Sequence, residues 1–183
     1  YKFVWSCNNW QKWGVINDFS SKSQVSLRPY TPGNYIIHVD IKDSKGNIIT
    51  KSVPFKMDLG WDAKLSTSVP KRIIGETVSA KAGVTNPSNR MSYTYKFVWS
   101  CNNWQSWGVI SDFSSKNNVS FTPKKQGNYV IYADIKDSLG NVVTKSSSFK
   151  MDLGWNANLS ASVPSNKTGS TITAKANVTS PLE

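Results

Sequence analysis

Apolar and polar residues alternate with a period of two over much of the chain, which is typical of half-buried β-strands. Over Tyr93–Trp99 the large side chains of Tyr93, Tyr95, Phe97 and Trp99 share one face, and this face is expected to point towards a second sheet. Similar short stretches occur at residues 65–69, 77–85, 119–121 and 129–135, and a last strand is expected to run through Phe149.

Turn signals separate these stretches at the spacing of a β-sandwich, and the chain shows no helical period. The segment Asn102–Ser115 is polar, aromatic and rich in turn residues, so it is predicted to be a connection. About seven strands per unit predict an all-β protein built from tandem β-sandwiches of the immunoglobulin or fibronectin type III kind.

The chain contains a long internal repeat. Residues 1–89 align with residues 95–183 at a constant offset of 94 without a gap, and 58 of the 89 pairs are identical. Repeats of this kind indicate modules of an array.

The natural unit is expected to begin near Trp61, because two strand signals lie between there and the second copy of the opening segment. This starting point divides the chain into four parts. Residues 1–60 would be a sandwich that lacks its first two strands, and residues 61–152 a complete sandwich. Residues 153–181 would be the first two strands of a third sandwich, and residues 182–183 resemble a cloning scar.

A sandwich without two strands has an open edge and an uncovered apolar face. We therefore expect residues 156–179 to complete residues 1–60 of another molecule by strand exchange (domain swapping). The alternative is a permuted unit that closes on itself, with modules at 1–92 and 95–183.

The net charge of +11 is dispersed, with 13 Lys/Arg and 6 Asp/Glu in residues 1–94 and 9 and 5 in residues 95–183. A positively charged surface of this kind favours the binding of polyanions, such as wall teichoic acids and acidic glycans. Scattered lysines argue against nucleic-acid binding, and without an 18-residue apolar run no membrane insertion is expected. Cys7 and Cys101 occupy equivalent positions, which excludes a disulfide within one module, so both are expected to be buried thiols.

The chain offers little for catalysis, and neither an enzyme nor a cofactor is expected. His38 is the only histidine and its counterpart is Tyr132, while glutamate occurs only at Glu76 and Glu183. Paired carboxylates would therefore have to be aspartates, namely Asp18 and Asp40 with their copies Asp112 and Asp134.

The turn after residue 40 carries oxygen ligands suited to calcium. These residues are Asp40, Asp43 and Asn47 with their copies Asp134, Asp137 and Asn141. The alternative is a turn stabilised by the Asp43 side chain, and Lys42 between the two acids weakens the metal interpretation.

Tryptophan is in excess, with four in each copy. Trp5 and Trp99 lie on the inward strand face and are expected in the core. An indole in the polar connection could instead stack on a sugar ring, with neighbouring amides for its hydroxyls. The candidates are Trp10, Trp13, Asn8, Asn9 and Gln11 in the first copy and Trp104, Trp107, Asn102 and Gln105 in the second. The alternative is that these indoles cap one end of the sandwich.

Tyr35 and Tyr129 each follow Gly-Asn and begin a strand, where a phenol can bond back to the backbone as a tyrosine corner. Together with the Trp-containing segment, these residues give a pattern that resembles the triple tyrosine domain. Tyr93, Tyr95 and Tyr129 match its tyrosines, and Pro32-Gly33-Asn34-Tyr35 keeps a proline that Gln126 replaces in the second copy. The resemblance covers about half of each repeat.

The resemblance implies a sandwich, found either beside propellers in sensor kinases or in tandem in Gram-positive surface proteins and wall hydrolases. The tandem arrangement predicts a spacer and adhesion segment of a secreted or surface protein, extracellular or in the cell wall, that binds cell-wall polysaccharide or another polyanion. The alternatives are a purely mechanical stalk and a periplasmic accessory of a sensor kinase.

Overall fold

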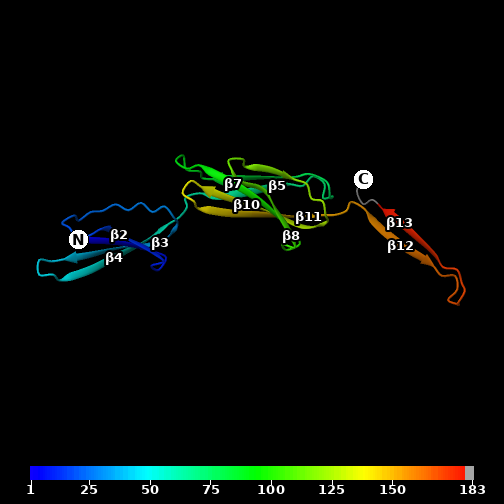
Figure 1. Ribbon diagram of the computed structural model, residues 1–183, viewed down its shortest axis with the longest axis horizontal. Helices are drawn as coiled ribbons and strands as arrows, with labels where there is room; N and C mark the ends of the chain where they lie inside the picture. Colours follow the sequence, from blue (N-terminus) through cyan, green and yellow to red (C-terminus); the bar gives the residue numbers. More distant parts are fainter. Residues whose placement is uncertain (180–183) are drawn as a thin grey trace. The chain divides into compact units, whose positions relative to one another are not determined.

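The computed structural model describes residues 1–179, and the regular elements of this part are all strands, paired antiparallel within their sheets (Figure 1). The predicted all-β class is therefore confirmed. The chain divides into two compact units: residues 1–62 with 86–91 and 138–141, and residues 63–85, 92–137 and the described residues from 142 onward.

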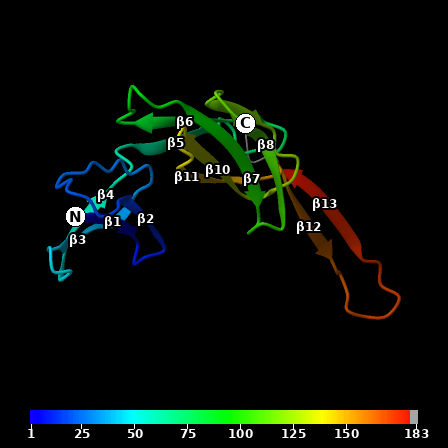
Figure 2. The same ribbon diagram turned by 60° about the vertical axis from the view of Figure 1, so that its left-hand side comes forward.

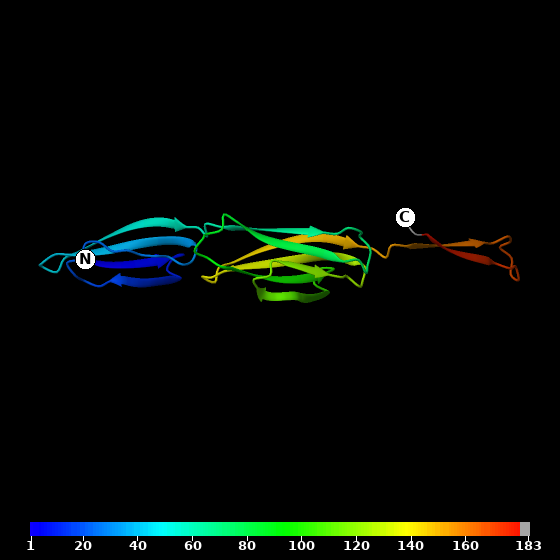
Figure 3. The same ribbon diagram turned by 90° about the horizontal axis from the view of Figure 1, so that it is seen from above.

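The first unit contains one four-stranded sheet in the order β2-β1-β3-β4, drawn blue to cyan in Figure 3. Its strands are β1 (Lys2–Cys7), β2 (Lys12–Asn17), β3 (Gly33–Lys42) and β4 (Ile48–Met57). The long β3–β4 hairpin pairs Gly33 with Met57 and Lys42 with Ile48.

Besides the terminal β12–β13 hairpin described below, the second unit contains two larger sheets, in the orders β11-β10-β7-β8 and β5-β6-β9. Its strands are β5 (Asp62–Ser68), β6 (Val78–Thr85), β7 (Tyr93–Cys101), β8 (Ser106–Ser114), β9 (Asn118–Phe121), β10 (Gly127–Asp137) and β11 (Val142–Met151). This arrangement of four and three strands is a β-sandwich.

The alternation seen in the sequence becomes the core of this sandwich. Phe97, Ile131, Ala133 and Ile135 face inward from the four-stranded sheet and are fully buried, and Val78, Ala80 and Ala82 of β6 are buried with them. Residues between them on each strand point outward, as the period of two requires. The two cysteines are buried and free, as predicted.

The prediction that Asn102–Ser115 forms a connection was wrong, because only its first residues turn and Ser106–Ser114 forms β8, paired with β7. The same correction holds for β2. Glycine is common in turns, but Gly108 lies within β8, where the Trp99 ring packs closely against it. A Cβ added at Gly108 would lie 2.8 Å from Nε1 of Trp99. A glycine can thus mark a tight approach of a neighbouring ring rather than the end of a strand.

The last two strands, β12 (Asn156–Ser162) and β13 (Thr173–Thr179), pair with each other as a two-stranded hairpin, orange to red in Figures 2 and 3. All residues of both strands are exposed. Their equivalents one repeat earlier, β5 and β6, are instead joined to β9 through the β6–β9 pairing.

A unit that begins near Trp61 would contain β5, β6 and β9 in one sandwich, and the β6–β9 pairing agrees with such a unit. The exact domain boundaries stay a prediction. Residues 180–183, which include the end of the predicted third unit and the predicted cloning scar at 182–183, lie outside the described residues.

Candidate functional site

The turn between β7 and β8 has an unusual backbone. Asn102, Asn103 and Trp104 all have positive φ, at 49°, 53° and 66°. The equivalent residues Asn8, Asn9 and Trp10 repeat this conformation at 48°, 54° and 65°. Asparagine tolerates the left-handed region better than most residues, whereas a tryptophan there must be held by its surroundings.

The first asparagine of the turn anchors it to the neighbouring strand. The Asn102 side-chain Oδ1 accepts a hydrogen bond from the Asn128 amide at 2.9 Å, and the Asn102 amide donates to the Asn128 carbonyl at 2.8 Å. Asn8 and Asn34 make the same pair at 3.0 and 2.8 Å. The side-chain oxygens of Asn8 and Asn102 therefore serve the turn, although the sequence suggested that these side chains bind sugar hydroxyls.

The turn places Trp104 against a residue on the outer face of the sheet. Its ring stacks on Tyr132 of β10, with centroids 5.0 Å apart and planes at 24°. In the first copy Trp10 stacks on His38 at 4.9 Å and 22°. Trp104 remains 51% exposed, so part of the indole stays available to a ligand.

A cavity of about 460 Å³ lies beside this stacked pair. Its polar lining comes from the turn, from outward positions of β7, β10 and β11 and from the loop after β5: Asn103, Ser100, Asn128, Ser148, Lys150 and Arg72. The indole, the amides, the hydroxyls and the two cations together match what a charged sugar requires.

Of the residues that line this cavity, the sequence had predicted only Trp104 as a binding residue. It missed the polar residues and the ring beside it: Ser100, Asn103, Asn128, Tyr132, Ser148, Lys150 and Arg72. The even-numbered residues of β10 and β11 could have been found, because strand alternation puts them on the outward face beside Ser100. Arg72 could not, since its loop reaches β11 only through tertiary contacts.

The other predicted binding residues do not line this cavity. Trp107 lies on β8 rather than in a connection, and 61% of its surface is exposed. Trp13 occupies the same place on β2. The backbone amides of Gln11 and Gln105 donate weakly to the Asn8 and Asn102 carbonyls, at 3.3 and 3.4 Å.

The tryptophans expected in the core do point inward. Trp99 stacks on Phe121 of the opposite sheet at 5.1 Å and lies 5.8 Å from Tyr129. Trp5 packs on Tyr35 in the same way, also at 5.8 Å.

Both corner tyrosines bond to the backbone four residues earlier, which is the contact that a tyrosine corner describes. The Tyr129 hydroxyl donates to the Lys125 carbonyl at 2.8 Å, and the Tyr35 hydroxyl donates to the Thr31 carbonyl at 3.0 Å. Burial, with a smaller contribution from a hydrogen bond to Cys101, raises the pKa of Tyr129 to about 12.

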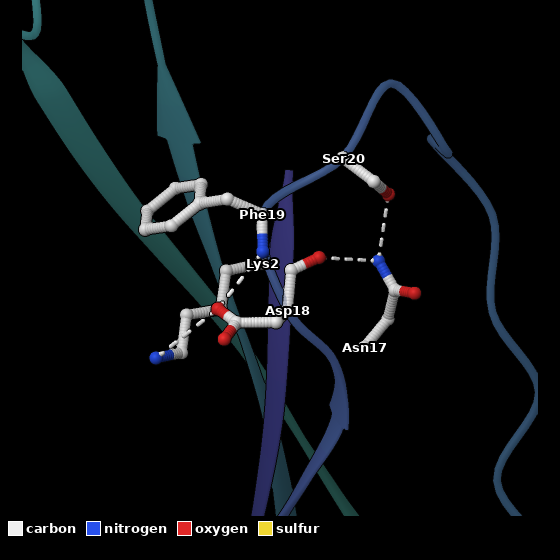
Figure 4. Close-up of polar contacts among 5 residues, drawn as sticks. All are labelled: Lys2, Asn17, Asp18, Phe19 and Ser20. Carbon is white, nitrogen blue, oxygen red and sulfur yellow. Dashed lines mark hydrogen bonds and ion pairs between the residues drawn. The ribbon is translucent and has the colours of Figure 1, made fainter.

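The aspartates considered for catalysis serve local structure. Asp18 accepts a hydrogen bond from the Phe19 amide at 2.9 Å and pairs with Lys2 at 3.5 Å (Figure 4). The Asn17 side-chain amide donates to the Asp18 carbonyl at 2.7 Å and to the Ser20 hydroxyl at 2.9 Å. The Phe19 amide and then Lys2 lower the pKa of Asp18. Asp112 has the same environment, with Phe113 at 2.8 Å and Lys96 at 3.6 Å. A lowered pKa keeps these carboxylates charged, which does not suit a general acid.

The predicted calcium ligands are engaged in separate contacts. Asp43 accepts from the Lys45 and Asn47 amides at 2.9 and 2.8 Å and from the Asn47 side chain at 2.8 Å, and these bonds, led by the Asn47 side chain, lower its pKa. Asp40 and its copy Asp134 each accept from a threonine hydroxyl at 2.6 Å.

Asp137 is buried, and Asn141 lies at the β10–β11 turn. Over residues 1–179, no three His, Cys, Asp or Glu side chains come together as a metal site would need. The contacts of Asp43 are those of an Asx-stabilised turn.

Comparison with known proteins gives little further information. No family model matches the sequence, and no curated protein matches it. One solved structure, a tetra-tandem repeat in the extending region of a large adhesion protein, aligns with 97% of this chain at 15% identity and a TM-score of 0.35. The alignment covers 48% of that structure, so this chain spans about half its length.

The fold assignment therefore rests on the strand pairings described above. A search of residues 1–179 for a helix with the length and apolar character of a membrane span found none.

Proposed function

We propose that this chain is a non-catalytic tandem β-sandwich segment of a secreted or surface protein, extracellular or at the cell wall, and that it acts as a spacer and adhesion module. We further propose that it belongs with the triple tyrosine domains and holds a cell-wall polysaccharide at the cavity beside Trp104. The observation that carries the proposal is this cavity, where an exposed indole, two amides and two cations converge.

Each part of the cavity supplies a different element of sugar recognition. The indole of Trp104, supported from one side by Tyr132, offers a flat apolar surface to a pyranose ring. Asn103 and Asn128 offer amide donors and acceptors to hydroxyl groups. Binding then requires no large conformational change of the protein, because Asn102 anchors the turn that holds the Trp104 indole in place.

The charge of the cavity favours an anionic polymer over a neutral one. Arg72 presents a guanidinium that can bind phosphate or carboxylate through two donors. Lys150 is already paired with Asp152 at 2.8 Å, so Arg72 is the main anion-binding group. Wall teichoic acids and acidic glycans carry both the rings and the charges that this set of groups matches.

The test is sedimentation with purified peptidoglycan, with and without its teichoic acid, alongside titration of tryptophan fluorescence. We expect Trp104→Ala to weaken binding about tenfold, since stacking is worth up to about 1.5 kcal/mol. Trp107→Ala is the matched control, because Trp107 is somewhat more exposed than Trp104 but lies outside the cavity. A salt series separates the two contributions: the charge-dependent part weakens with salt and the stacking part does not.

Two results would contradict the proposal. If Trp104→Ala binds as tightly as the unmodified chain, the cavity is not the binding site. If the unmodified chain sediments with neither wall preparation, the adhesion role fails and the purely mechanical stalk is the better interpretation.

A further inference from the structure

We propose that the second unit bears tension through a mechanical clamp, in which the segment Arg72–Ile74, after its first strand, is bonded to Asp152, directly after its last large strand. A spacer is pulled at both ends, so the contact between its first and last segments decides the force at which it opens. This inference rests on the proposed spacer role and is independent of the glycan site.

Tension along the chain acts on two edge strands of this unit. β5 is its first strand and lies at the edge of the sheet β5-β6-β9, while β11 precedes the exit of the chain and lies at the edge of β11-β10-β7-β8. An edge strand is hydrogen-bonded to a neighbour on one side only. Without a further contact, both strands could therefore be detached from their sheets.

The segments that begin and end the sandwich run side by side in the same direction. The hydroxyls of Thr67 on β5 and Ser147 on β11 share a hydrogen bond of 2.7 Å. Further along, Ile73 forms a parallel bridge with Asp152. Because the contacts advance together along both segments, the chain enters the sandwich at the opposite end from the one where it leaves.

Backbone hydrogen bonds close the clamp. The Asp152 amide donates to the Arg72 carbonyl at 2.8 Å, and the Ile74 amide donates to the Asp152 carbonyl at 2.9 Å. The Gly75 amide donates to the Pro123 carbonyl at 2.8 Å, which fixes the end of the segment to the loop after β9. The first part of the unit is thus bonded directly to the chain leaving the opposite sheet.

The chain beyond Asp152 packs over the clamp. Gly154 lies so close to Ile73 that an added Cβ would be 2.7 Å from Cγ2 of Ile73. Glycine permits both this approach and the φ of 80° at that position. The contact adds van der Waals packing to the hydrogen bonds of the clamp.

The parallel direction determines how these bonds respond to force. A pull on the N-terminal side acts on Arg72–Ile74, and a pull on the C-terminal side acts on Asp152 in the opposite direction along the same axis. The bonds of the clamp are therefore loaded together in shear, whereas a hairpin pulled open at its ends breaks its bonds one after another. Forced unfolding depends on the rate of unfolding, so the clamp should set that rate.

Single-molecule pulling of the full chain by its two ends tests the clamp. After rupture the chain from Ile73 to Asp152 can extend by about 260–280 Å, compared with about 180–200 Å for the strands at residues 2–57 of the first unit. The released length therefore identifies the event that belongs to the second unit.

A pair of proline variants locates the resistance. Ile74→Pro removes one donor of the clamp, and we expect the rupture force of the second unit to fall by about half. Lys71→Pro is the matched control in the same loop, because the clamp hydrogen bonds are donated by the amides of Ile74 and Asp152.

A core variant separates the clamp from general stability. Ile135→Ala should lower the urea midpoint more than Ile74→Pro does, yet lower the rupture force less, because Ile135 is fully buried and lies outside the clamp. Near-ultraviolet circular dichroism of each variant should confirm that the second unit is folded.

Thr67→Val provides a second measurement that leaves the backbone donors in place. It removes the hydroxyl bonded to Ser147, and it should lower the rupture force by less than Ile74→Pro. An unchanged force in Thr67→Val or in folded Ile74→Pro would overturn the clamp, as would an equal loss in Lys71→Pro. These measurements need no ligand, so failure of the wall-binding test would leave the clamp standing, and failure of the clamp would leave the wall-binding result unchanged.

Discussion

Tyr129 illustrates at the residue scale how one side chain can serve packing and hydrogen bonding together. Its ring lies between Phe149, at 5.7 Å, and Trp99, at 5.8 Å, while its hydroxyl reaches the Lys125 carbonyl. Tyr35 repeats the arrangement with Phe55 and Trp5. The Tyr129 ring thus packs among aromatic neighbours, and its hydroxyl is hydrogen-bonded to the backbone.

Replacing Tyr129 with phenylalanine should keep the packing and remove only the hydrogen bond. We expect Tyr129→Phe to lower the free energy of unfolding of the second unit by about 1 kcal/mol, measured by urea denaturation. Tyr132→Phe is the matched control on the same strand, since that ring lies on the outer face.

A pH series adds a second readout. The pKa of Tyr129 is raised, so its stabilising contribution is complete below pH 10 and is lost as pH rises through about 12. The unmodified protein should therefore lose stability over this interval more steeply than Tyr129→Phe. Equal slopes would show that Tyr129 titrates normally.

At the scale of elements, β9 shows that a strand can depend wholly on its neighbour. Residues 118–121 and 24–27 share Val and Ser at their two central positions, yet only the first segment is a strand. β6 supplies the hydrogen bonds in one case, whereas in the other no strand within residues 1–179 pairs with the segment.

Amide hydrogen exchange should resolve this difference. We expect the paired amides of residues 118–121 to be protected and those of residues 24–27 to exchange at nearly the rate of an open chain. Fragment-resolved mass spectrometry gives both values from one sample. Equal protection of residues 24–27 and 118–121 would show that the shorter segment forms a strand without a neighbour, and would contradict this dependence.

The whole molecule joins units of unequal stability. The second unit buries apolar side chains between two sheets, whereas the described part of the first has a single sheet. Because the hydrophobic contribution scales with buried apolar area, the two units should not unfold together.

Calorimetry of dilute protein should therefore show two transitions, the first unit melting at the lower temperature. Ile135→Ala should lower the free energy of unfolding of the second unit by about 2–5 kcal/mol, because Ile135 is fully buried. The melting temperature of the upper transition should therefore fall, and that of the lower transition should not. Ile41→Ala at the equivalent, exposed position should change the lower transition much less. A single cooperative transition that both variants shift equally would contradict this independence.

The sequence by itself determined the all-β class, most of the strands, the repeat and the inward faces of Trp99 and Phe97. These features follow from a period of two, which is a local property of the chain. Strand β8 escaped prediction because the close packing of Trp99 on Gly108 is invisible without the fold.

Only the tertiary structure decided the burial of Ile135, the exposure of Ile41 and the meeting of Trp104, Tyr132 and Arg72. The two isoleucines lie in identical local sequence, and a covering sheet distinguishes them. Likewise, the cavity joins residues from four separate segments, and no local pattern records which segments become neighbours when the sheets assemble.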